Sequence, residues 1–102
     1  MSPPNFVLEL SDSAKADFRD ILSYTLQMWG DWQVEAYREV IDGALKAIAE
    51  NPQAGRQRSG SGLLFSLAGK HLIFYRIDGP RIFVVRILHG RMDLDSRLED
   101  ER

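Results

Sequence analysis

The stretch HLIFYRIDGPRIFVVRILHG, residues 71–90, decides the fold of this chain of 102 residues. It contains two apolar runs, His71–Ile77 and Arg81–His89, that are rich in β-branched and aromatic residues, as strands are. Asp78-Gly79-Pro80 separates the runs and is typical of a hairpin turn. Because proline has no N–H, a two-residue loop would lose a ladder hydrogen bond, so we expect a slightly longer loop.

A further strand precedes this hairpin. Leu63–Ala68 is a third apolar run, and Gly69-Lys70 is a credible turn between it and the next, so the sequence predicts a three-stranded antiparallel meander. If the later loop has an even residue count, alternation puts Leu72, Phe74, Arg76, Phe83, Val85, Ile87 and His89 on one face, and His71, Ile73, Tyr75, Ile77, Ile82, Val84, Arg86 and Leu88 on the other. Both faces are largely apolar, which indicates central strands. A domain this small has little chain left to cover the second face.

The N-terminal half predicts a strand and two helices. Phe6–Leu10 alternates like a short strand, and Ser11 or Ser13 then offers a helix N-cap. Apolar residues at helical spacing follow as far as Gly30, a plausible helix stop. The first buried stripe consists of Ala14, Phe18, Ile21, Leu22, Thr25, Met28 and Trp29.

The second helix begins at once, with Asp31 as its expected N-cap, and ends at Asn51-Pro52, since proline supplies no amide hydrogen. Its stripe consists of Val34, Tyr37, Ile41, Ala44, Leu45 and Ile48. Gly43 costs about 1 kcal/mol relative to alanine inside a helix and permits a close crossing there. Two helices joined by so short a link must pack antiparallel.

The predicted fold class is therefore α+β. An N-terminal strand precedes an antiparallel helical hairpin, which packs on the antiparallel β-meander, all within a single domain over residues 1–102. Residues 53–62, QAGRQRSGSG, are expected to form the loop that joins the hairpin to the meander.

The charge is divided unevenly along the chain. The whole chain carries a net charge of −2, but residues 1–50 hold four basic and nine acidic side chains, and residues 51–97 hold eight basic and three acidic ones. The second half can therefore face an acidic partner, although two ordinarily solvated halves would give the same numbers. The acidic total argues against a general nucleic-acid coat, and we expect no sequence-specific nucleic-acid binding.

Several classes of function are excluded or disfavoured. The chain has no cysteine and only His71 and His89, which excludes disulfides and thiolate metal sites, and we expect neither metal nor cofactor. No signal peptide or membrane-length apolar run occurs, so we expect a cytoplasmic protein without membrane contact.

Catalysis is the weaker interpretation of the polar residues. Phosphate-cradling glycine loops and nucleophile elbows are absent. An RNA-cleaving site around His89 would need a second proton-transfer group, and Tyr75 and Asp93 are the only nearby candidates. Tyr75 is more typical of a core residue, and a histidine that closes a strand is more often structural. We therefore expect a protein that acts by binding.

An ordered set of short motifs points to a family. They include Leu10-Ser11, Trp29-Gly30, Glu50-Asn51-Pro52, Gly55-Arg56, HLIFYR at 71–76 and ILHGRMDL at 87–94. With these motifs the chain resembles the ParE-type toxins of bacterial toxin–antitoxin systems, within the wider RelE/ParE superfamily. The resemblance covers nearly the whole length.

This resemblance implies a toxin that is not an enzyme, binds DNA gyrase and traps it on cleaved DNA. It also implies a ParD-like antitoxin whose C-terminal segment wraps the helical hairpin. RelE-like relatives instead cut mRNA on the ribosome, and an endoribonuclease of that type is the first alternative. A degenerate or purely structural partner of an antitoxin, without toxicity, is the second. The chain departs from that group because it is acidic overall and has no tyrosine after Tyr75.

Two sets of residues are candidates for binding. Apolar side chains on the hairpin suit an amphipathic partner helix, although scattered exposed apolar residues are also normal. The antitoxin-binding candidates are Tyr24, Leu26, Trp29 and Trp32, and the target-binding candidates are Arg56, Arg58, Arg76, Arg86, His89 and Arg91.

Overall fold

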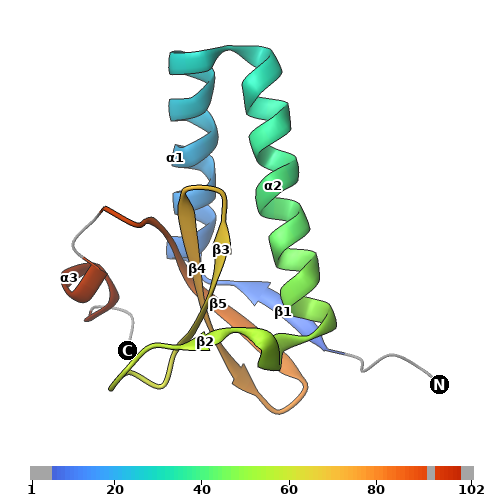
Figure 1. Ribbon diagram of the computed structural model, residues 1–102, viewed down its shortest axis with the longest axis vertical. Helices are drawn as coiled ribbons and strands as arrows, with labels where there is room; N and C mark the ends of the chain where they lie inside the picture. Colours follow the sequence, from blue (N-terminus) through green and yellow to red (C-terminus); the bar gives the residue numbers. More distant parts are fainter. Residues whose placement is uncertain (1–5, 92–93, 100–102) are drawn as a thin grey trace.

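A computed structural model describes residues 6–91 and 94–99 (Figure 1). Its elements in chain order are β1 (Val7–Leu10), α1 (Asp12–Trp29), α2 (Asp31–Glu50), the 3-10 turn η1 (Pro52–Ala54), β2 (Arg56–Gln57), β3 (Leu64–Ala68), β4 (His71–Asp78), β5 (Arg81–His89) and α3 (Leu94–Glu99). The predicted strand, helical hairpin and meander are all present, so the α+β fold class is confirmed. The expectation of a structureless loop over 53–62 is wrong in part, because η1 and β2 occupy its first half.

The five strands form one mixed sheet in the order β1-β5-β4-β3-β2. The meander β3-β4-β5 is antiparallel throughout, and β1 joins its far edge parallel to β5, with Leu10 opposite Val84. Figure 1 shows the hairpin of α1 and α2 rising beyond the sheet, so that only its lower half lies against the strands.

The turn between β4 and β5 is tighter than expected. Asp78 pairs directly with Arg81, which leaves a loop of two residues, Gly79-Pro80. Gly79 has a φ of +60°, as the first loop position of a type II′ turn requires. Pro80 takes the second position, where no ladder donor is needed, and its carbonyl accepts the Val7 amide at 2.9 Å. The missing N–H therefore costs nothing.

A β-bulge changes the predicted faces of β5. Phe74 pairs with Arg86 and Tyr75 pairs with Val84, so Val85 is an extra residue on β5. The predicted alternation of β5 side chains between the two sheet faces is right up to Val85. After Val85 it is wrong, because one inserted residue moves each later side chain to the opposite face. Ile87 consequently lies in the hairpin-side core and Leu88 in the core on the other face.

The hydrophobic core has two parts. The larger part lies between the sheet and the hairpin and includes Ile41, Ile73 and Tyr75. The smaller part lies on the opposite face and joins Phe74, Leu88 and Leu98 of α3, with Leu63 and Val85. The expectation that little chain remained for this second face is wrong, since α3 covers part of it and Leu98 is buried there.

Local sequence explains how the hairpin is set on the sheet. Ser11 is the N-cap of α1: its hydroxyl accepts the Ala14 amide at 2.9 Å and donates to the Val85 carbonyl at 2.7 Å. Gly30 alone links the helices, with a φ of +88° and a ψ of 178° that are essentially restricted to glycine. The expected N-cap role of Asp31 is wrong, because Gly30 occupies that position and Asp31 is the first helical residue.

Candidate functional site

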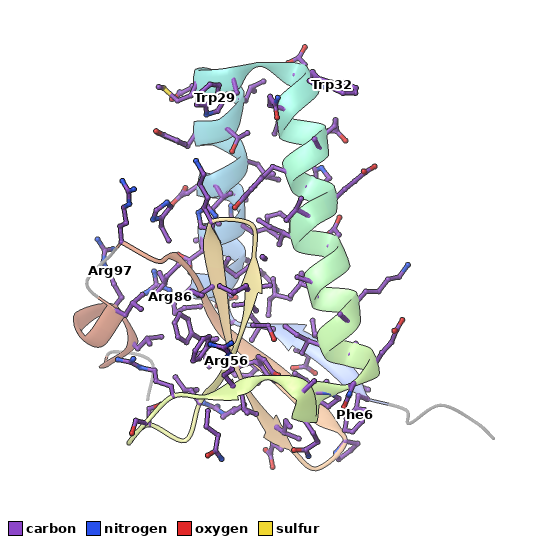
Figure 2. The ribbon with its side chains drawn as sticks, in the orientation of Figure 1. Phe6, Trp29, Trp32, Arg56, Arg86 and Arg97 are labelled. Carbon is purple, nitrogen blue, oxygen red and sulfur yellow. The ribbon has the colours of Figure 1, made fainter. Side chains whose placement is uncertain are left out.

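The four antitoxin-binding candidates lie in the halves of α1 and α2 nearest the Gly30 link. Trp29 and Trp32 flank the Gly30 link and are 67% and 80% exposed, and Tyr24 and Leu26 are exposed as well. Figure 2 shows both tryptophans at the end of the hairpin farthest from the sheet. The buried stripe expected for α1 ends before this point, so Met28 and Trp29 are exposed and not part of the core. Nothing in the described part of the fold explains why these large side chains are there.

A groove lies at the other end of α2, beside the sheet. It has a volume of about 390 Å³ and lies between the C-terminal half of α2 and the outer edge of β3. We call it the α2–β3 groove; its lining residues are Ala44, Ala47, Ile48, Asn51, Ala54, Arg56, Phe65, Ser66 and Leu67. It exists because β2 pairs only with Leu64 and Phe65 and leaves the rest of the β3 edge uncovered.

Sequence reasoning missed this groove and two exposed apolar residues, one of which lines it. Leu67 is 69% exposed on β3, and Val40 on α2 is exposed too. The shortness of β2 determines the uncovered edge, and no residue pattern in 53–62 indicated a strand there. The one available signal was Gly43. No contact within the described fold requires a glycine at this position of α2, because a Cβ there would meet nothing within 4 Å.

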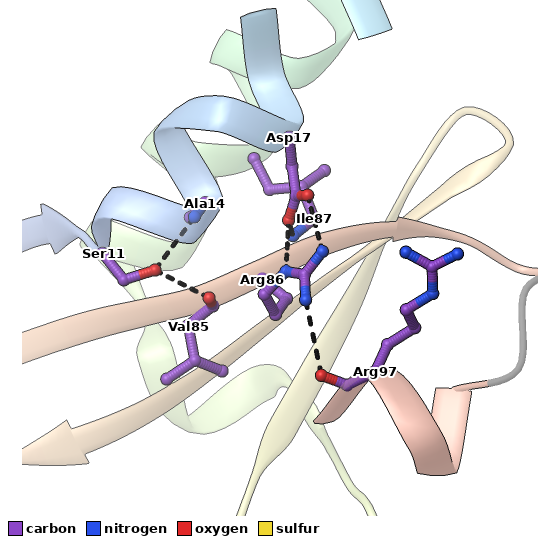
Figure 3. Close-up of polar contacts among 7 residues, drawn as sticks. All are labelled: Ser11, Ala14, Asp17, Val85, Arg86, Ile87 and Arg97. Atoms are coloured by element: carbon purple, nitrogen blue, oxygen red, sulfur yellow. Dashed lines mark hydrogen bonds and ion pairs between the residues drawn. The ribbon is translucent and has the colours of Figure 1, made fainter. Parts of the chain in front are cut away.

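Arg86, a target-binding candidate, is held inside the fold. Its Nε and Nη2 atoms donate to the two Asp17 carboxylate oxygens at 2.7 and 2.8 Å, and Nη1 donates to the Arg97 carbonyl at 3.4 Å (Figure 3). Asp17 also accepts the Ile87 amide at 2.9 Å, on the edge of β5 that β1 leaves uncovered. Both side chains are more than four-fifths buried. This two-point ion pair fastens α1 to β5 and leaves Arg86 little capacity to contact a target.

The other basic candidates do not converge on one cleft. Arg56 lies on β2 and lines the α2–β3 groove, and Arg58 follows it, with its amide donating to the Leu63 carbonyl at 2.8 Å. Arg76 lies on β4, where its guanidinium carbon stands 4.8 Å from the centroid of the Phe83 ring. Arg91 follows β5 at the opposite end of that hairpin.

His89 belongs to a small polar network at the end of the sheet. Its ring meets the ring of His71, its cross-strand partner, edge to face at 5.3 Å between centroids, and its Nδ1 accepts the Arg91 amide at 3.1 Å. The Tyr37 hydroxyl of α2 lies 2.5 Å from His71 Nδ1, accepts the Lys70 amide at 3.0 Å and lies 3.2 Å from the Ala68 carbonyl. The network therefore joins α2 to the β3–β4 turn and to the end of β5.

Burial governs how this network titrates. It lowers the pKa of His71, the neighbouring His89 lowers it further, and Asp17 acts in the opposite direction. Burial likewise raises the pKa of Tyr37 against the effect of the Lys70 amide. Both groups are consequently neutral near pH 7.

Of the two remaining catalytic candidates, only Tyr75 lies among the described residues. Tyr75 is fully buried and donates to the Pro52 carbonyl at 2.7 Å, so its interpretation as a core residue is confirmed. A side chain at Gly55 would collide with the Tyr75 hydroxyl, which accounts for glycine there. Asp93 lies outside the described residues. Neither the α2–β3 groove nor the smaller polar hollow at Glu9, Arg76 and Phe83 includes His89.

The described residues form neither a metal site nor a membrane span. Over 6–91 and 94–99, no group of three or more His, Asp or Glu side chains is placed to hold a metal ion. In the same ranges, none of the helices combines the length and apolar character that crossing a bilayer demands.

Comparison with known proteins places the chain among toxins. The profile of the family described as the ParE toxin of the type II toxin–antitoxin system parDE matches residues 8–94. The chain belongs to the ParE toxin family. Toxin ParE1 of Mycobacterium tuberculosis is 39% identical to it over 92 residues, covering 87% of this chain and 94% of the relative.

Further relatives agree with this assignment, and two solved structures share the fold. Toxin ParE1 of Caulobacter vibrioides is 35% identical, covering 87% of this chain and 94% of the relative, and Toxin ParE of Escherichia coli is 35% identical, with 89% and 91% covered. The fold matches a structure of the chromosomal ParDE system from P. aeruginosa with a TM-score of 0.72 at 20% identity, over 83% of this chain and 96% of that one. It also matches the M. tuberculosis RelBE2 toxin–antitoxin complex, with a TM-score of 0.57 at 18% identity over 83% and 98%.

Proposed function

We propose that this ParE family member inhibits DNA gyrase by binding it, and that a ParD-like antitoxin holds it inactive by covering the helical hairpin. Family membership supports the role of toxin, and the structures of similar fold include a toxin–antitoxin complex. Because gyrase and its DNA are cytoplasmic in bacteria, the proposed place of action is the cytoplasm.

The observation that carries the antitoxin part is the uncovered apolar surface of the hairpin. Trp29 and Trp32 are more than two-thirds exposed, and the α2–β3 groove opens at the other end of α2. Large exposed aromatic side chains gathered in one part of the surface are typical of a binding surface, and tryptophan is among the residues that contribute most to binding energy. An amphipathic helix is the partner that such a surface suits.

The proposal that the toxin acts without catalysis draws on how its polar groups are used. Arg86 is bound by Asp17, His71 by Tyr37, and His89 by the backbone of its own turn. General acid–base catalysis needs side chains within hydrogen-bond reach of a substrate. The exposed cations Arg56, Arg76 and Arg91 instead offer separate contact points for an acidic surface.

The decisive experiment measures gyrase directly. Purified protein is added to gyrase with relaxed plasmid, and we expect loss of supercoiling and accumulation of cleaved DNA. Addition of the antitoxin encoded beside the gene should reverse both effects. Undisturbed supercoiling, together with ribosome-dependent cuts at codon positions in mRNA, would replace this proposal with an endoribonuclease of the RelE type.

A second experiment tests the hairpin as the antitoxin site. Leu26→Glu and Trp32→Glu should each weaken antitoxin binding by about 2 kcal/mol or more, because a charge replaces an apolar anchor. Their stability should change by less than about 0.5 kcal/mol, since both side chains are exposed. Val7→Glu, which changes an exposed apolar residue on β1, is the matched control. Unchanged affinity in both hairpin variants by calorimetry would remove the hairpin from the interface.

A further inference from the structure

The link between α1 and α2 is a single residue, Gly30, and it interrupts what is otherwise one run of helix. Its N–H donates to the Leu26 carbonyl at 3.0 Å as the last bond of α1, and its carbonyl accepts the Val34 amide at 3.2 Å as the first bond of α2. The amides of residues 31–33 have no carbonyl to bond within α2, and no side chain caps this helix start. Only the Gly30 conformation therefore separates the two helices.

Glycine is compatible with a straight form as well as with the turn. It tolerates the observed φ of +88°, and it also adopts the negative φ of a helix without a steric penalty. With Gly30 helical, the amides of residues 31–33 would bond the carbonyls of residues 27–29, and α1 and α2 would form one helix over residues 12–50. Straightening thus satisfies backbone groups that the turn leaves to water.

In such a helix, exposed apolar residues from both sides of Gly30 would share one face. They recur every three or four residues across the link, as the helical period requires. We call this set the joint stripe; it consists of Leu22, Leu26, Trp29, Trp32, Ala36, Val40, Gly43 and Ala47. All except the half-buried Leu22 are exposed in the hairpin, and Tyr24 and Met28 lie off this face.

The hairpin divides this stripe between two places. Figure 2 shows Trp29 on the α1 side and Trp32 on the α2 side of the end of the hairpin at Gly30, which we call the hairpin tip. An apolar pattern that keeps its period across the turn is typical of a segment that can also be one helix.

The middle of the joint stripe is nearly free of charge. Residues 21–34 contain one charged side chain, Asp31, although charged residues make up 27% of the chain. Asp31 directly precedes Trp32, so it points away from the stripe on a helix. Glu39 adjoins the stripe and Glu50 follows Ala47 on the same face, but both lie outside this segment. Two copies can therefore bring their middle segments together with little repulsion, and tryptophan without charge is typical of an interface core.

We propose that two copies of the chain form a domain-swapped dimer in which Gly30 is helical and each copy's β1 and α1 pack on the sheet and α2 of the other. A straightened helix carries β1 and α1 away from their own sheet, so a second copy has to supply them there. The exchanged contacts include Leu10 beside Val84 and the ion pair of Asp17 with Arg86.

The same contacts exist in both forms, so they do not decide between them. The balance depends on the conformation of Gly30, on the joint stripe and on protein concentration. In the dimer the two long helices run antiparallel about a two-fold axis near Gly30, which places Trp29 of one copy next to Trp32 of the other. Side chains that are exposed at the hairpin tip are then covered by the second copy.

Gly30→Ala tests the link. Alanine is strained at a φ of +88° and favoured in a helix, so the substitution opposes the hairpin and favours the straight form. We expect the parent protein to be monomeric when dilute and to dimerise as its concentration rises, and the variant to have a dimer dissociation constant lower by about tenfold or more. Sedimentation equilibrium measures both. Gly90→Ala is the matched control, because its φ is not positive and a Cβ there meets nothing within 4 Å; it should change the constant less than about twofold.

Insertion of two glycines after Gly30 is the opposite test. A longer link relieves the turn and interrupts a continuous helix, so this variant should stay monomeric where Gly30→Ala dimerises. Circular dichroism and urea unfolding establish that each variant is folded. Should Gly30→Ala not fold, the parent protein at high concentration is compared with the insertion variant instead. A parent protein that stays monomeric at every concentration, or an insertion variant that dimerises as the parent does, would overturn the proposal.

A cysteine pair distinguishes exchange from simple surface association. The chain has no cysteine, so an introduced pair reports which copy supplies β1. Val7 on β1 lies opposite Arg81 on β5, at a strand separation that a disulfide can span. After oxidation of Val7→Cys/Arg81→Cys in the Gly30→Ala background, or in the parent if that variant does not fold, the monomer fraction should run as single chains on a non-reducing gel and the dimer fraction as a covalent pair.

A dimer fraction that separates into single chains would show association without exchange and would overturn the proposal. Neither gyrase nor antitoxin enters these measurements. Their outcome is therefore independent of the gyrase and antitoxin assays, and a failure of one leaves the other standing.

Discussion

The two ends of the helical hairpin have opposite surface chemistry. At the free end Trp29 and Trp32 are exposed, and no contact within the described fold accounts for them. Where the hairpin packs against the sheet, which we call the sheet end, polar side chains are bound to one another: Asp17 to Arg86, and Tyr37 to His71. No buried side-chain nitrogen or oxygen among the described residues lacks a hydrogen-bond partner. The comparison suggests that polar residues at the sheet end serve the fold, and apolar residues at the free end serve a partner.

The largest effect expected from this division is at Asp17. Asp17→Ala leaves the Arg86 guanidinium and the Ile87 amide without their acceptor, and breaking such a largely buried pair costs about 3–5 kcal/mol. Asp20→Ala, which changes an exposed carboxylate on the same helix, should cost less than about 0.5 kcal/mol. Denaturant unfolding of the two variants checks the difference. Similar stabilities would mean that Asp17 does not fasten α1 to β5.

Gly43 gives a smaller effect that sharpens the comparison. Alanine at an exposed helical glycine stabilises by about 0.5–1 kcal/mol, and open space surrounds this position. We therefore expect Gly43→Ala to raise the melting temperature while it weakens antitoxin binding, because the added methyl group stands where a partner backbone approaches. Thermal unfolding and calorimetric titration measure the two quantities on one sample. A stabilised variant with unchanged affinity would separate Gly43 from the interface.

The architecture was predictable from the sequence, because strong local signals specify it. The alternation of His71–Ile77, the helical stripes and the Gly30 link gave the strand, hairpin and meander in the right order. Ser11 was identified as an N-cap because its hydroxyl precedes an apolar helical pattern. Each of these features depends on neighbouring residues in the chain.

Two errors, the Asp31 cap and the length of the Gly79-Pro80 turn, are local. The others concern features that depend on distant residues. The Val85 bulge exchanged the faces of Ile87 and Leu88, and alternation alone cannot reveal an inserted residue. The ion pair of Arg86 joins residues 69 positions apart, so nothing local separated it from the exposed arginines. The α2–β3 groove depends on how short β2 is. The exposure of the tryptophans at the hairpin tip is consistent with the predicted antitoxin site, and the antitoxin titrations of the Leu26→Glu and Trp32→Glu variants test it.

The smallest expected effect is the pH dependence of the network at the sheet end. Because the folded state lowers the pKa of His71, mainly through burial and then through His89, the unfolded chain binds its proton more readily. Stability should therefore be constant well above the ordinary histidine pKa of about 6.5 and should fall as the pH drops below it. Asp17 opposes the lowering of the His71 pKa, Tyr37 and Lys70 adjoin the His71 ring, and His89 contributes like charge when protonated.

A His71→Gln variant keeps a polar partner for Tyr37 and removes the titrating group. Its unfolding free energy should therefore fall less steeply between pH 7 and pH 5 than that of the parent protein. Parallel profiles for the two proteins would show that the network carries no proton linkage. In that event the sheet end would still be saturated with hydrogen bonds, but the contrast with the hairpin tip would be one of exposure and not of titration.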